Sequence, residues 1–575
     1  MNAQGQPNRR MSGAKLVVEC LRREGVECVF AYPGAASMEL HQALIGSGIR
    51  VILPRHEQGG GFEADGYARA SGRPGVCIAT SGPGATNLVT AITDAYMDSV
   101  PLVAITAQVN QKLIGKNAFQ ETDIIGMTRP VVKHSYLVLA AEDIPEAIRD
   151  AFHLAAHGRP GPVVIDITCD VLPQLCRPAL PDQPSLRAFT FLPETTDCTL
   201  HTLADRLRAS RRPCLFAGGG IIRGGASDLL LQFAEKWQIP VATSLMGIGC
   251  FPEDNPLSLK FAGMHGAYCA NKAINDCDLL LCLGVRFSDR VTGDIGRFAP
   301  HAFIVHADID ESEINKNVRA DLPIVADAAD LLDRLLRIPP ELPEDRDAWL
   351  ARINTWKKRH PLRAPSAPGL HGPNVIEALR RATSGDATIV TGVGQHQMWA
   401  AQLYTYRRPR QLLTSGGLGA MGFGLPAAIG AAFALREQKQ PNPLVLIDGD
   451  GSFQMNIQEL ATLFAGNLPV KMVILDNQML GMVAQWEDQF HHGRHGNTSL
   501  VLRRNGGRPY PDFPAIAHAY SIPAEHVMCE EALDDALRRM LDAPGPYLLD
   551  VHIGKHDAVL PMIPAGQSCG EVILE

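Results

Sequence analysis

The chain has 575 residues, of which 46% are hydrophobic and 20% are charged, and its formal net charge at pH 7 is −8. This length predicts about three domains of an ordinary globular protein. The acidic balance, without any local run of basic residues, excludes nucleic acid as an expected partner. No apolar stretch is long enough to span a membrane and no apolar core follows the N-terminal arginines, so we expect no membrane association and a cytoplasmic location.

Short apolar runs alternate with longer amphipathic segments along the whole chain. The runs lie at 76–80, 101–106, 162–167, 213–218, 279–284, 303–308, 387–392, 445–450, 470–476 and 547–553. This alternation is typical of strand–helix–strand units. Because the runs are apolar throughout, they predict parallel α/β sheets that are covered by helices on both faces.

Two proline-rich passages, 178–194 and 338–373, interrupt this alternation and indicate exposed connections between domains. They divide the apolar runs into three groups. We therefore predict three doubly wound α/β domains, at 10–180, 195–340 and 370–550, followed by a C-terminal tail at 551–575.

Two neighbouring strand ends in the last domain carry oxygen ligands. One apolar run ends in the sequence GDG, which contains Asp450 and Gly451, and the next run ends just before Asn477. Parallel strands would bring Asp450 and Asn477 to the same sheet edge, where a carboxylate, an amide oxygen and a nearby carbonyl suit Mg²⁺. The glycines let a diphosphate approach the backbone. A GDG sequence alone is more often a plain turn, but the paired strand ends indicate thiamine-diphosphate binding, and hence an enzyme.

Glu57 follows the apolar run 51–54 and precedes two glycines. By itself, a glutamate in this position is more often a solvated loop residue. A thiamine cofactor, however, requires a carboxyl group that drives its aminopyrimidine ring into the imino tautomer. We therefore predict that Glu57 activates the cofactor and that His56 beside it is a local hydrogen-bonding residue.

From end to end, the sequence resembles the catalytic subunits of the acetolactate synthase (acetohydroxyacid synthase) family. The resemblance is carried by VFAYPGAASMELHQAL (29–44), RHEQGG (55–60), IATSGPGATNL (78–88), GRPGPVVIDI (158–167), GMHG (263–266), TGVGQHQMWAAQ (391–402), SGGLGAMGFGLPAAIGA (415–431), GDGSF (449–453), GMVAQWED (481–488) and VLPMIP (559–564). It implies the three-domain thiamine-diphosphate enzyme fold, with pyrimidine-binding, FAD-binding and diphosphate-binding domains in that order.

The resemblance also implies the reaction. The enzyme would decarboxylate pyruvate on thiamine diphosphate and condense the resulting hydroxyethyl carbanion with a second 2-ketoacid. Pyruvate as acceptor would give 2-acetolactate and 2-ketobutyrate would give 2-aceto-2-hydroxybutyrate, the precursors of valine and leucine and of isoleucine. The working unit would be a homodimer or homotetramer, because family members place the glutamate and the diphosphate site on different subunits. A small regulatory subunit is a further implied partner.

The family's site residues map onto matching positions of this sequence. Glu57 would activate the cofactor, while Phe119 and Gln120 would project into the active site. Arg290 would hold the carboxylate of the second ketoacid, which suits a guanidinium fork, and Trp486 would shape the pocket for its alkyl group. The pyrimidine pocket would contain Tyr32, Pro83 and Asn87; the diphosphate cradle Gln395, His396, Gly419, Ala420, Met421, Gly451 and Ser452; and the Mg²⁺ site Asp450, Asn477 and the carbonyl of Met479.

The middle domain resembles the FAD-binding domain of the family, in which FAD has no redox role in the net reaction. Gly218, Gly219 and Gly220 follow a strand and would form a phosphate turn, a weak signal by itself. The implied FAD-binding residues are Arg159, Gly219, Ser244, Leu245, Gly263, Met264, His265, Gly284, Arg286, Asp308, Ile309, Asp327, Gly416 and Gly417.

Several positions depart from the family pattern. They are Ala35, Ala107, Asn110, Lys116, Asn117, Cys169, Ser288 and Asp476. Because most would lie near the active-site entrance, one hypothesis is a divergent paralogue with altered acceptor preference or inhibitor response; neutral drift is the alternative. Three further interpretations are another pyruvate-type thiamine enzyme (an oxidase or decarboxylase), a catalytically silent subunit, and a redox flavoprotein. Arg290 and Trp486 argue against the first, and Glu57 argues against the second.

Overall fold

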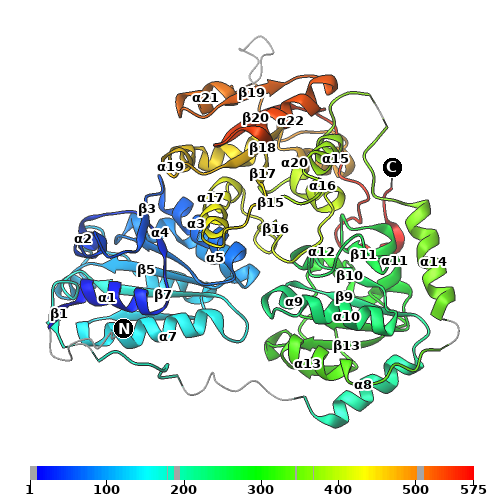
Figure 1. Ribbon diagram of the computed structural model, residues 1–575, viewed down its shortest axis with the longest axis horizontal. Helices are drawn as coiled ribbons and strands as arrows, with labels where there is room; N and C mark the ends of the chain where they lie inside the picture. The colour runs from blue at the N-terminus through cyan, green and yellow to red at the C-terminus, as the bar shows by residue number, and fades with distance from the viewer. Residues whose placement is uncertain are drawn as a thin grey trace. The chain divides into compact units, whose positions relative to one another are not determined.

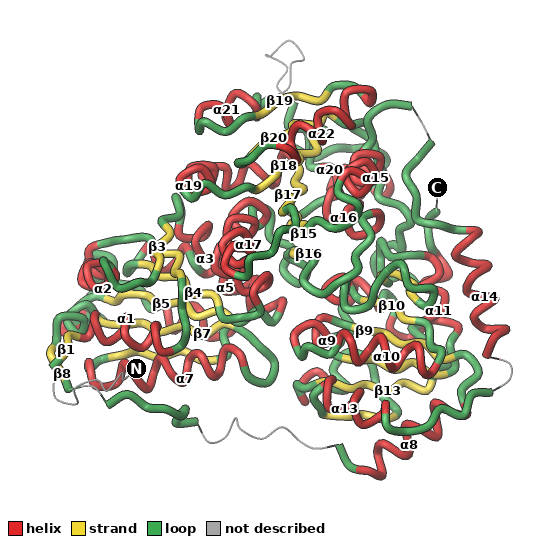
Figure 2. Tube along the Cα trace, viewed as in Figure 1, coloured by secondary structure: helices red, strands yellow, loops and turns green. Residues whose placement is uncertain are grey.

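The computed structural model describes residues 10–177, 179–186, 195–343, 346–366, 368–501 and 510–574 (Figure 1). Three six-stranded sheets, whose described strand pairings are parallel, form the framework, and β1 (Met11–Ser12) pairs with β8 (Leu175–Cys176) in a short antiparallel ladder. Helices and strands alternate along the trace (Figure 2). The predicted α/β class with three parallel sheets is therefore confirmed.

The chain forms two compact units. The first consists of the described part of Met1–Phe191 together with Ser415–Pro441 and Gln454–Val470. Its sheet has the order β3 (Arg50–Ile52), β2 (Cys28–Ala31), β4 (Gly75–Ala79), β5 (Leu102–Gln108), β7 (Pro162–Thr168) and β6 (His134–Val138). Its helices are α1 (Gly13–Arg23), α2 (Met38–Leu44), α3 (Glu57–Ser71), α4 (Pro83–Asn87), α5 (Val89–Asp98), α6 (Ile124–Thr128), α7 (Ile144–Ala156), α17 (Gly424–Glu437) and α19 (Leu460–Ala465).

The second unit consists of the described parts of Leu192–Thr414, Asn442–Phe453 and Lys471–Glu575, and it holds two sheets. The middle sheet has the order β11 (Ser258–Phe261), β10 (Val241–Thr243), β9 (Pro213–Ala217), β12 (Leu279–Leu283), β13 (Phe303–Asp308) and β14 (Leu322–Val325). Its helices are α8 (Asp197–Ala209), α9 (Gly219–Arg223), α10 (Ser227–Trp237), α11 (Tyr268–Asp276), α12 (Asp289–Thr292), α13 (Ala328–Leu336) and α14 (Arg346–Arg359).

The last sheet has the order β16 (Leu412–Leu413), β15 (Thr388–Thr391), β17 (Leu444–Gly449), β18 (Val470–Asp476), β20 (Tyr547–His552) and β19 (Ala524–Val527). Its helices in the same unit are α15 (Gly372–Ala382), α16 (Gln395–Leu403), α18 (Asp450–Phe453), α20 (Gly481–Phe490), α21 (Phe513–Ala519) and α22 (Leu533–Asp542). The predicted domain bounds remain a prediction, which the division into two units does not test.

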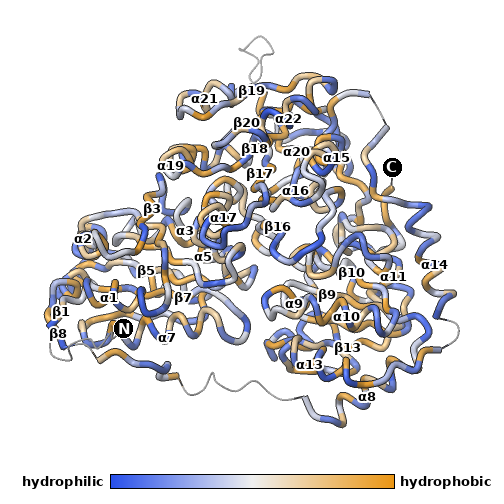
Figure 3. The backbone as a smooth tube through the Cα atoms, viewed as in Figure 1, coloured by the Kyte–Doolittle hydropathy of each residue, from blue (hydrophilic) through white to orange (hydrophobic). Residues whose placement is uncertain are grey.

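The central strands are apolar because both faces of each sheet are covered. In β9 of the middle sheet, Leu215 belongs to one buried cluster and Phe216 to another, on opposite faces of the strand. Alternate side chains of a strand point to opposite faces, so a strand that is covered on both sides needs an apolar residue at every position. Figure 3 shows hydrophobic colouring along these strands, whereas α14 is largely hydrophilic.

Part of the predicted connection at 338–373 is a helix. In α14, Trp349 and Ile353 are buried, and the indole nitrogen of Trp349 donates to the carbonyl of Pro213 at 3.0 Å. Arg346 is also buried and donates to three backbone carbonyls. The prolines lie on either side of this segment, so the expectation of a continuous exposed connection was wrong there. In the other passage, 178–194, residues 178 and 187–194 lie outside the described residues.

Helices α3 and α17 pack closely in the first unit, and glycines allow it. A Cβ at Gly66 would lie 2.2 Å from the carbonyl oxygen of Ala427, and one at Gly430 would lie 1.8 Å from the carbonyl oxygen of Glu63. The rings of Phe62 and Phe423 meet edge to face, with centroids 5.5 Å apart. No helix among the described residues is long and apolar enough to cross a membrane.

A buried guanidinium lies beside this helix pair. Arg69 on α3 binds the Asp65 carboxylate, and its Nη2 lies 3.1 Å from Asp94 and 3.0 Å from Asp98 on α5. All four side chains are buried. Removing one partner of a buried charge cluster is costly, because the remaining charges keep their desolvation penalty without compensation.

We predict that Arg69→Met destabilises the protein by about 3–5 kcal/mol, because three buried carboxylates lose their shared cation. Chemical denaturation followed by circular dichroism measures this as a lower midpoint of the first unfolding transition. Arg22→Met, which removes an exposed ion pair on α1, is the matched control and should change little. Equal midpoints for the two variants would contradict the assignment.

Candidate active site

Glu57 and its predicted partners meet at one sheet edge of the first unit. Glu57 opens α3 after β3, Tyr32 follows β2, and Asn87 ends α4 after β4, and these three strands are neighbours in the sheet. The Asn87 side-chain amide donates to Glu57 Oε2 at 2.9 Å. Pro83 occupies the first turn of α4. The structure thus brings the predicted activating carboxylate and two strand ends of the predicted pyrimidine pocket together.

His56 has the local role predicted for it. It is the N-cap residue of α3, and its Nδ1 accepts the backbone N–H of Gln58 at 3.2 Å. This bond satisfies one of the unpaired N–H groups at the start of the helix, as N-cap side chains do. His56 therefore fixes the backbone next to Glu57.

Glu459 braces the same loop, and sequence reasoning missed it. Its carboxylate accepts the backbone N–H groups of Arg55 at 2.9 Å and of His56 at 3.0 Å, and also the hydroxyl of Thr462 at 2.7 Å. A Cβ at Gly59 would lie 2.4 Å from Glu459 Oε1, so only a glycine fits there. Glu459 lies about 400 positions after Arg55 in the chain, and no local sequence pattern predicts the contact between them.

A second buried carboxyl group lies beside Glu459. Glu63 on α3 is fully buried, and burial together with the neighbouring Glu459 raises its pKa well above the usual range. Burial also raises the pKa of Glu459, whose carboxylate accepts the loop's N–H groups. The pair fixes the backbone that carries Glu57.

Gln120 and Phe119 lie on a loop that approaches the same edge. Gln120 has a φ of +61°, and a Cβ at Gly82 would lie 2.9 Å from the Cα of Gln120. A non-glycine residue in the left-handed region costs energy and is held there by its surroundings. Phe119 is 88% exposed, so its predicted projection into the active site stays a prediction.

The predicted metal ligands meet at a sheet edge of the second unit. Asp450 begins α18 after β17, and Asn477 follows β18, the adjacent strand. Asn477 Oδ1 accepts the backbone N–H of Met479 at 3.0 Å, which places these two residues side by side. Asp450 and Asp476 are both buried; burial and the Asp476 carboxyl raise the pKa of Asp450 well above its usual range. A divalent cation here would offset this buried negative charge, so the residues fit Mg²⁺.

Gln395 links this edge to α20. Asn477 Nδ2 donates to Gln395 Oε1 at 3.3 Å, and Gln395 Nε2 donates to Gln485 Oε1 at 3.1 Å. A Cβ at Gly481 would lie 2.1 Å from Gln395 Oε1, so the backbone of α20 packs directly on this amide. Sequence reasoning did not single out Gln485, although it lies inside the quoted motif at 481–488. His396 is the second residue of α16, and its Nε2 lies 3.4 Å from the Asp448 carboxylate.

Other members of the predicted cradle belong to the first unit. The backbone N–H groups of Gly416 and Gly417 donate to Asp98 at 2.9 and 2.7 Å. The Ala420 N–H donates to Ser415 Oγ at 2.9 Å, and Ser415 also binds Asp94. The loop that contains Gly419, Ala420 and Met421 is therefore tied to the Arg69 cluster.

The two predicted acceptor residues contact each other. Arg290 is the second residue of α12, which belongs to the middle sheet's layer of helices, and Trp486 lies on α20 of the last sheet. The guanidinium carbon of Arg290 is 5.9 Å from the indole centroid of Trp486. This distance allows a cation–π interaction. Arg290 also lines a cavity with Met264, Asn271, Ile563 and Gln567. A cation beside an apolar ring can hold a carboxylate and an alkyl group together.

The predicted FAD residues of the middle sheet follow neighbouring strands. Gly218 follows β9 and Gly284 follows β12, and a Cβ at Gly218 would lie 2.0 Å from the Gly284 carbonyl oxygen. Asp327 is the N-cap residue of α13, and Asp308 ends β13. The others placed in this unit are Gly219, Ser244, Leu245, Gly263, Met264, His265, Arg286 and Ile309, whereas Arg159, Gly416 and Gly417 lie in the first unit. Burial lowers the pKa of His265 to about 4.

Two of the departures keep local structure intact. Ser288 is the N-cap residue of α12 and accepts the N–H of Arg290 at 3.4 Å, a role that serine and aspartate share. Asn110 caps a short helical turn through the N–H of Lys112 at 3.0 Å. Cys169 follows β7 and is half-buried, and burial raises the pKa of its thiol. Nothing in the structure explains Ala35.

Three protein-family models match: the N-terminal thiamine pyrophosphate (TPP) binding domain of the thiamine pyrophosphate enzymes over residues 11–127, their central domain over 200–335, and their C-terminal TPP binding domain over 392–551. Together with the two sheet edges, they define the chain as a thiamine pyrophosphate enzyme, which binds the cofactor also called thiamine diphosphate.

Individual relatives show to which family of thiamine pyrophosphate enzymes the chain belongs. The chain is 50% identical to acetolactate synthase 1, chloroplastic, of Nicotiana tabacum over 99% of its length and 86% of the relative's. It is 49% identical to the chloroplastic acetolactate synthase of Arabidopsis thaliana and 50% identical to acetolactate synthase 2, chloroplastic, of Zea mays, over 99% of this chain and 85% and 90% of those proteins. The chain belongs to the acetolactate synthase family.

The same relatives overturn one expectation. Each is named as chloroplastic, so the predicted cytoplasmic location is wrong. The prediction rested on the lack of an apolar leader core, which excludes only secretory signals. Segments that direct proteins to plastids are amphipathic and carry no such core.

We predict that Glu459→Gln slows exchange of the C2 proton of bound thiamine diphosphate about tenfold. The amide nitrogen of glutamine would face backbone N–H donors and shift the loop that carries Glu57. Deuterium exchange followed by nuclear magnetic resonance measures the rate. Glu39→Gln, an exposed change on α2 of the same unit, is the control. An exchange rate that is unchanged in Glu459→Gln would contradict the bracing role.

Proposed function

We propose that the chain catalyses the acetolactate synthase reaction. It would decarboxylate pyruvate and join the remaining two-carbon fragment to a second 2-ketoacid, which gives 2-acetolactate from pyruvate or 2-aceto-2-hydroxybutyrate from 2-ketobutyrate. The observation that carries this proposal, beyond the family, is the contact between Arg290 and Trp486. An oxidase or a plain decarboxylase has no second ketoacid to bind and no need for this pair.

Thiamine diphosphate is the cofactor of the family, and Mg²⁺ and FAD are proposed beside it. Asp450, Asn477 and the Met479 carbonyl would hold Mg²⁺, since they supply hard oxygen donors at one strand edge. The bound thiamine cofactor supplies a nucleophilic carbon and an electron sink for decarboxylation. FAD would lie at the strand ends of the middle sheet, where Gly218 and Gly284 leave no room for side chains.

The chain's own residues would perform three tasks. Glu57, held by Asn87 and by the loop braced on Glu459, would hold a proton at its carboxyl oxygen and exchange it with the aminopyrimidine ring. Arg290 would pair with the carboxylate of the second ketoacid, and the Trp486 ring would pack against its alkyl group. Phe119 and Gln120 would cover the reacting centre and keep water out.

We further propose the assembly. A homodimer or homotetramer would combine Glu57 of one subunit with Asp450 and Asn477 of another, as in the family that the sequence resembles. The three predicted domains, at 10–180, 195–340 and 370–550, with the tail at 551–575, are proposed on the same basis. A small regulatory subunit is a proposed partner, and the substrates are small 2-ketoacids.

We predict that Glu57→Gln lowers acetolactate formation at least about a hundredfold, because glutamine can accept the Asn87 bond but cannot transfer a proton. Product analysis with thiamine diphosphate, Mg²⁺, FAD and pyruvate measures the effect. Acetaldehyde or acetate as the main product of the unaltered chain would contradict the proposed reaction. Glu39→Gln should behave like the unaltered chain.

Trp486→Leu should change which ketoacid is accepted. We predict that the ratio of acetohydroxybutyrate to acetolactate, measured in competition between 2-ketobutyrate and pyruvate, changes about tenfold, because a missing apolar contact is worth about 1–3 kcal/mol. Trp356→Leu on α14 is the matched control. If both variants keep the original ratio, the Trp486 ring does not contact the acceptor.

A further inference from the structure

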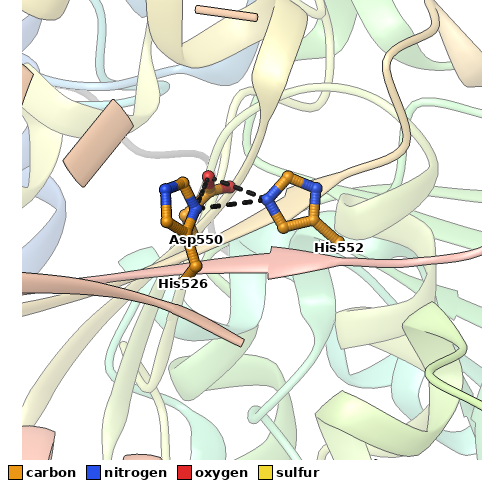
Figure 4. A group of neighbouring side chains, drawn as sticks. All are labelled: His526, Asp550 and His552. Atoms are coloured by element: carbon orange, nitrogen blue, oxygen red, sulfur yellow. Dashed lines mark hydrogen bonds and ion pairs between the residues drawn. The ribbon is translucent and has the colours of Figure 1, made fainter. Parts of the chain in front are cut away.

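Two histidines and an aspartate meet on one face of the last sheet. His526 lies on β19, and Asp550 and His552 lie on β20, two positions apart (Figure 4). In the strand register, His526 is the direct neighbour of Asp550. Alternate residues of a strand point to the same face, so His552 shares the face of Asp550. Adjacent strands, rather than loops, therefore fix all three side chains.

The three donor atoms have the spacing of a metal site. Asp550 Oδ2 lies 2.9 Å from His526 Nδ1 and 3.2 Å from His552 Nε2, and the two nitrogens are 3.3 Å apart. Ligands bound at about 2.0–2.1 Å in a tetrahedron around Zn²⁺ lie about 3.3–3.4 Å from one another. The triangle of donor atoms therefore matches one face of such a tetrahedron to within a few tenths of an ångström.

The other ring nitrogens face carboxylates. His526 Nε2 lies 3.4 Å from Asp512, and His552 Nδ1 lies 3.6 Å from Asp476. Histidines that bind metals commonly place the second nitrogen against a carboxylate, which fixes the tautomer and the ring orientation. Asp550 is fully buried, and its Oδ1 has no hydrogen-bond partner among the described residues. A buried carboxylate that is only partly satisfied needs a compensating charge.

We propose that His526, Asp550 and His552 bind a divalent ion of the zinc class. Two imidazole nitrogens and one carboxylate oxygen suit Zn²⁺ or Co²⁺ and leave a fourth position for water. Mg²⁺ prefers oxygen ligands only, so it would not compete for these nitrogens. The His526 side chain is 35% exposed, which gives the ion a path from solvent.

The proposed site would also support the neighbouring strand end. In the register, Asp476 on β18 is the direct neighbour of His552, and Asp476 lies beside the predicted Mg²⁺ ligand Asp450. The ion would fix His552, and His552 would hold the Asp476 side chain in place. This gives a physical role to Asp476, one of the departures from the family pattern. The site itself does not depend on the proposed reaction.

Metal binding to the full-length protein tests the site directly. The protein, freed of metal by a chelator and then saturated with Mg²⁺ and thiamine diphosphate, is titrated with Zn²⁺, and bound zinc is measured by mass spectrometry. We expect about one zinc per chain, which falls below about a tenth in His526→Gln and His552→Gln. Asp512→Asn should weaken zinc binding about tenfold, since it removes only the carboxylate beside the second ring nitrogen of His526.

Cobalt supplies an independent readout. Co²⁺ in place of Zn²⁺ should give the intense visible absorption of a four-coordinate site in the unaltered protein, and both histidine variants should lose it. The control is His201→Gln, which alters an exposed histidine on α8 and should keep both signals. No zinc bound above background, or the same zinc content in His526→Gln as in the control, would overturn the proposal. The titration of the unaltered protein can overturn the proposal even if a variant fails to fold, because a protein that binds no zinc has no such site.

Discussion

Parallel strands have to end at a common edge, and this constraint decides where the functional side chains lie. Glu57, Tyr32 and Asn87 come from three neighbouring strand–helix connections of the first sheet. Asp450 and Asn477 come from two neighbouring connections of the last sheet. In open α/β sheets, ligands bind outside the carboxyl ends of the strands, because side chains and helix N-termini converge there. Each half of the proposed thiamine site is therefore built on a rigid framework.

Charged side chains at these sheet edges are buried, and the structure compensates each buried charge in a different way. Arg69 forms ion pairs with three aspartates, and two of these, Asp94 and Asp98, hold the loop at Ser415–Gly417. Burial beside Glu459 raises the pKa of Glu63, and the Glu459 carboxylate accepts backbone N–H groups. Burial and neighbouring carboxyl groups raise the pKa values of Asp450 and Asp476, and a divalent ion bound there would offset the negative charge. Burial without compensation would unfold these edges.

The strand-end motifs could be predicted from sequence. Short apolar runs predict strands, and the glycine or acidic residues that follow them lie at the strand ends, where functional side chains are expected. They led to Glu57, Asp450 and Asn477 and to the three sheets. The contacts of Glu459 and Gln485 could not be predicted, since they join segments far apart in the chain without a local signal. The helix α14 was missed because flanking prolines dominate the composition of that stretch, although its two tryptophans recur at helical spacing. His526, Asp550 and His552 are scattered in sequence, and only the register of β19 and β20 brings them together.

The proposed assembly combines two half-sites, Glu57 on one sheet and Asp450 on another, into one active site contributed by different subunits. Subunit complementation tests it most directly: inactive Glu57→Gln chains and inactive Asp450→Asn chains are unfolded, mixed in equal amounts and refolded together. If each site draws on two subunits, half of the dimers are mixed and one of the two sites in each is intact. We therefore expect recovery of about a quarter of the original activity. Activity that remains at the level of the separate variants, in a mixture shown to contain mixed dimers, would contradict it.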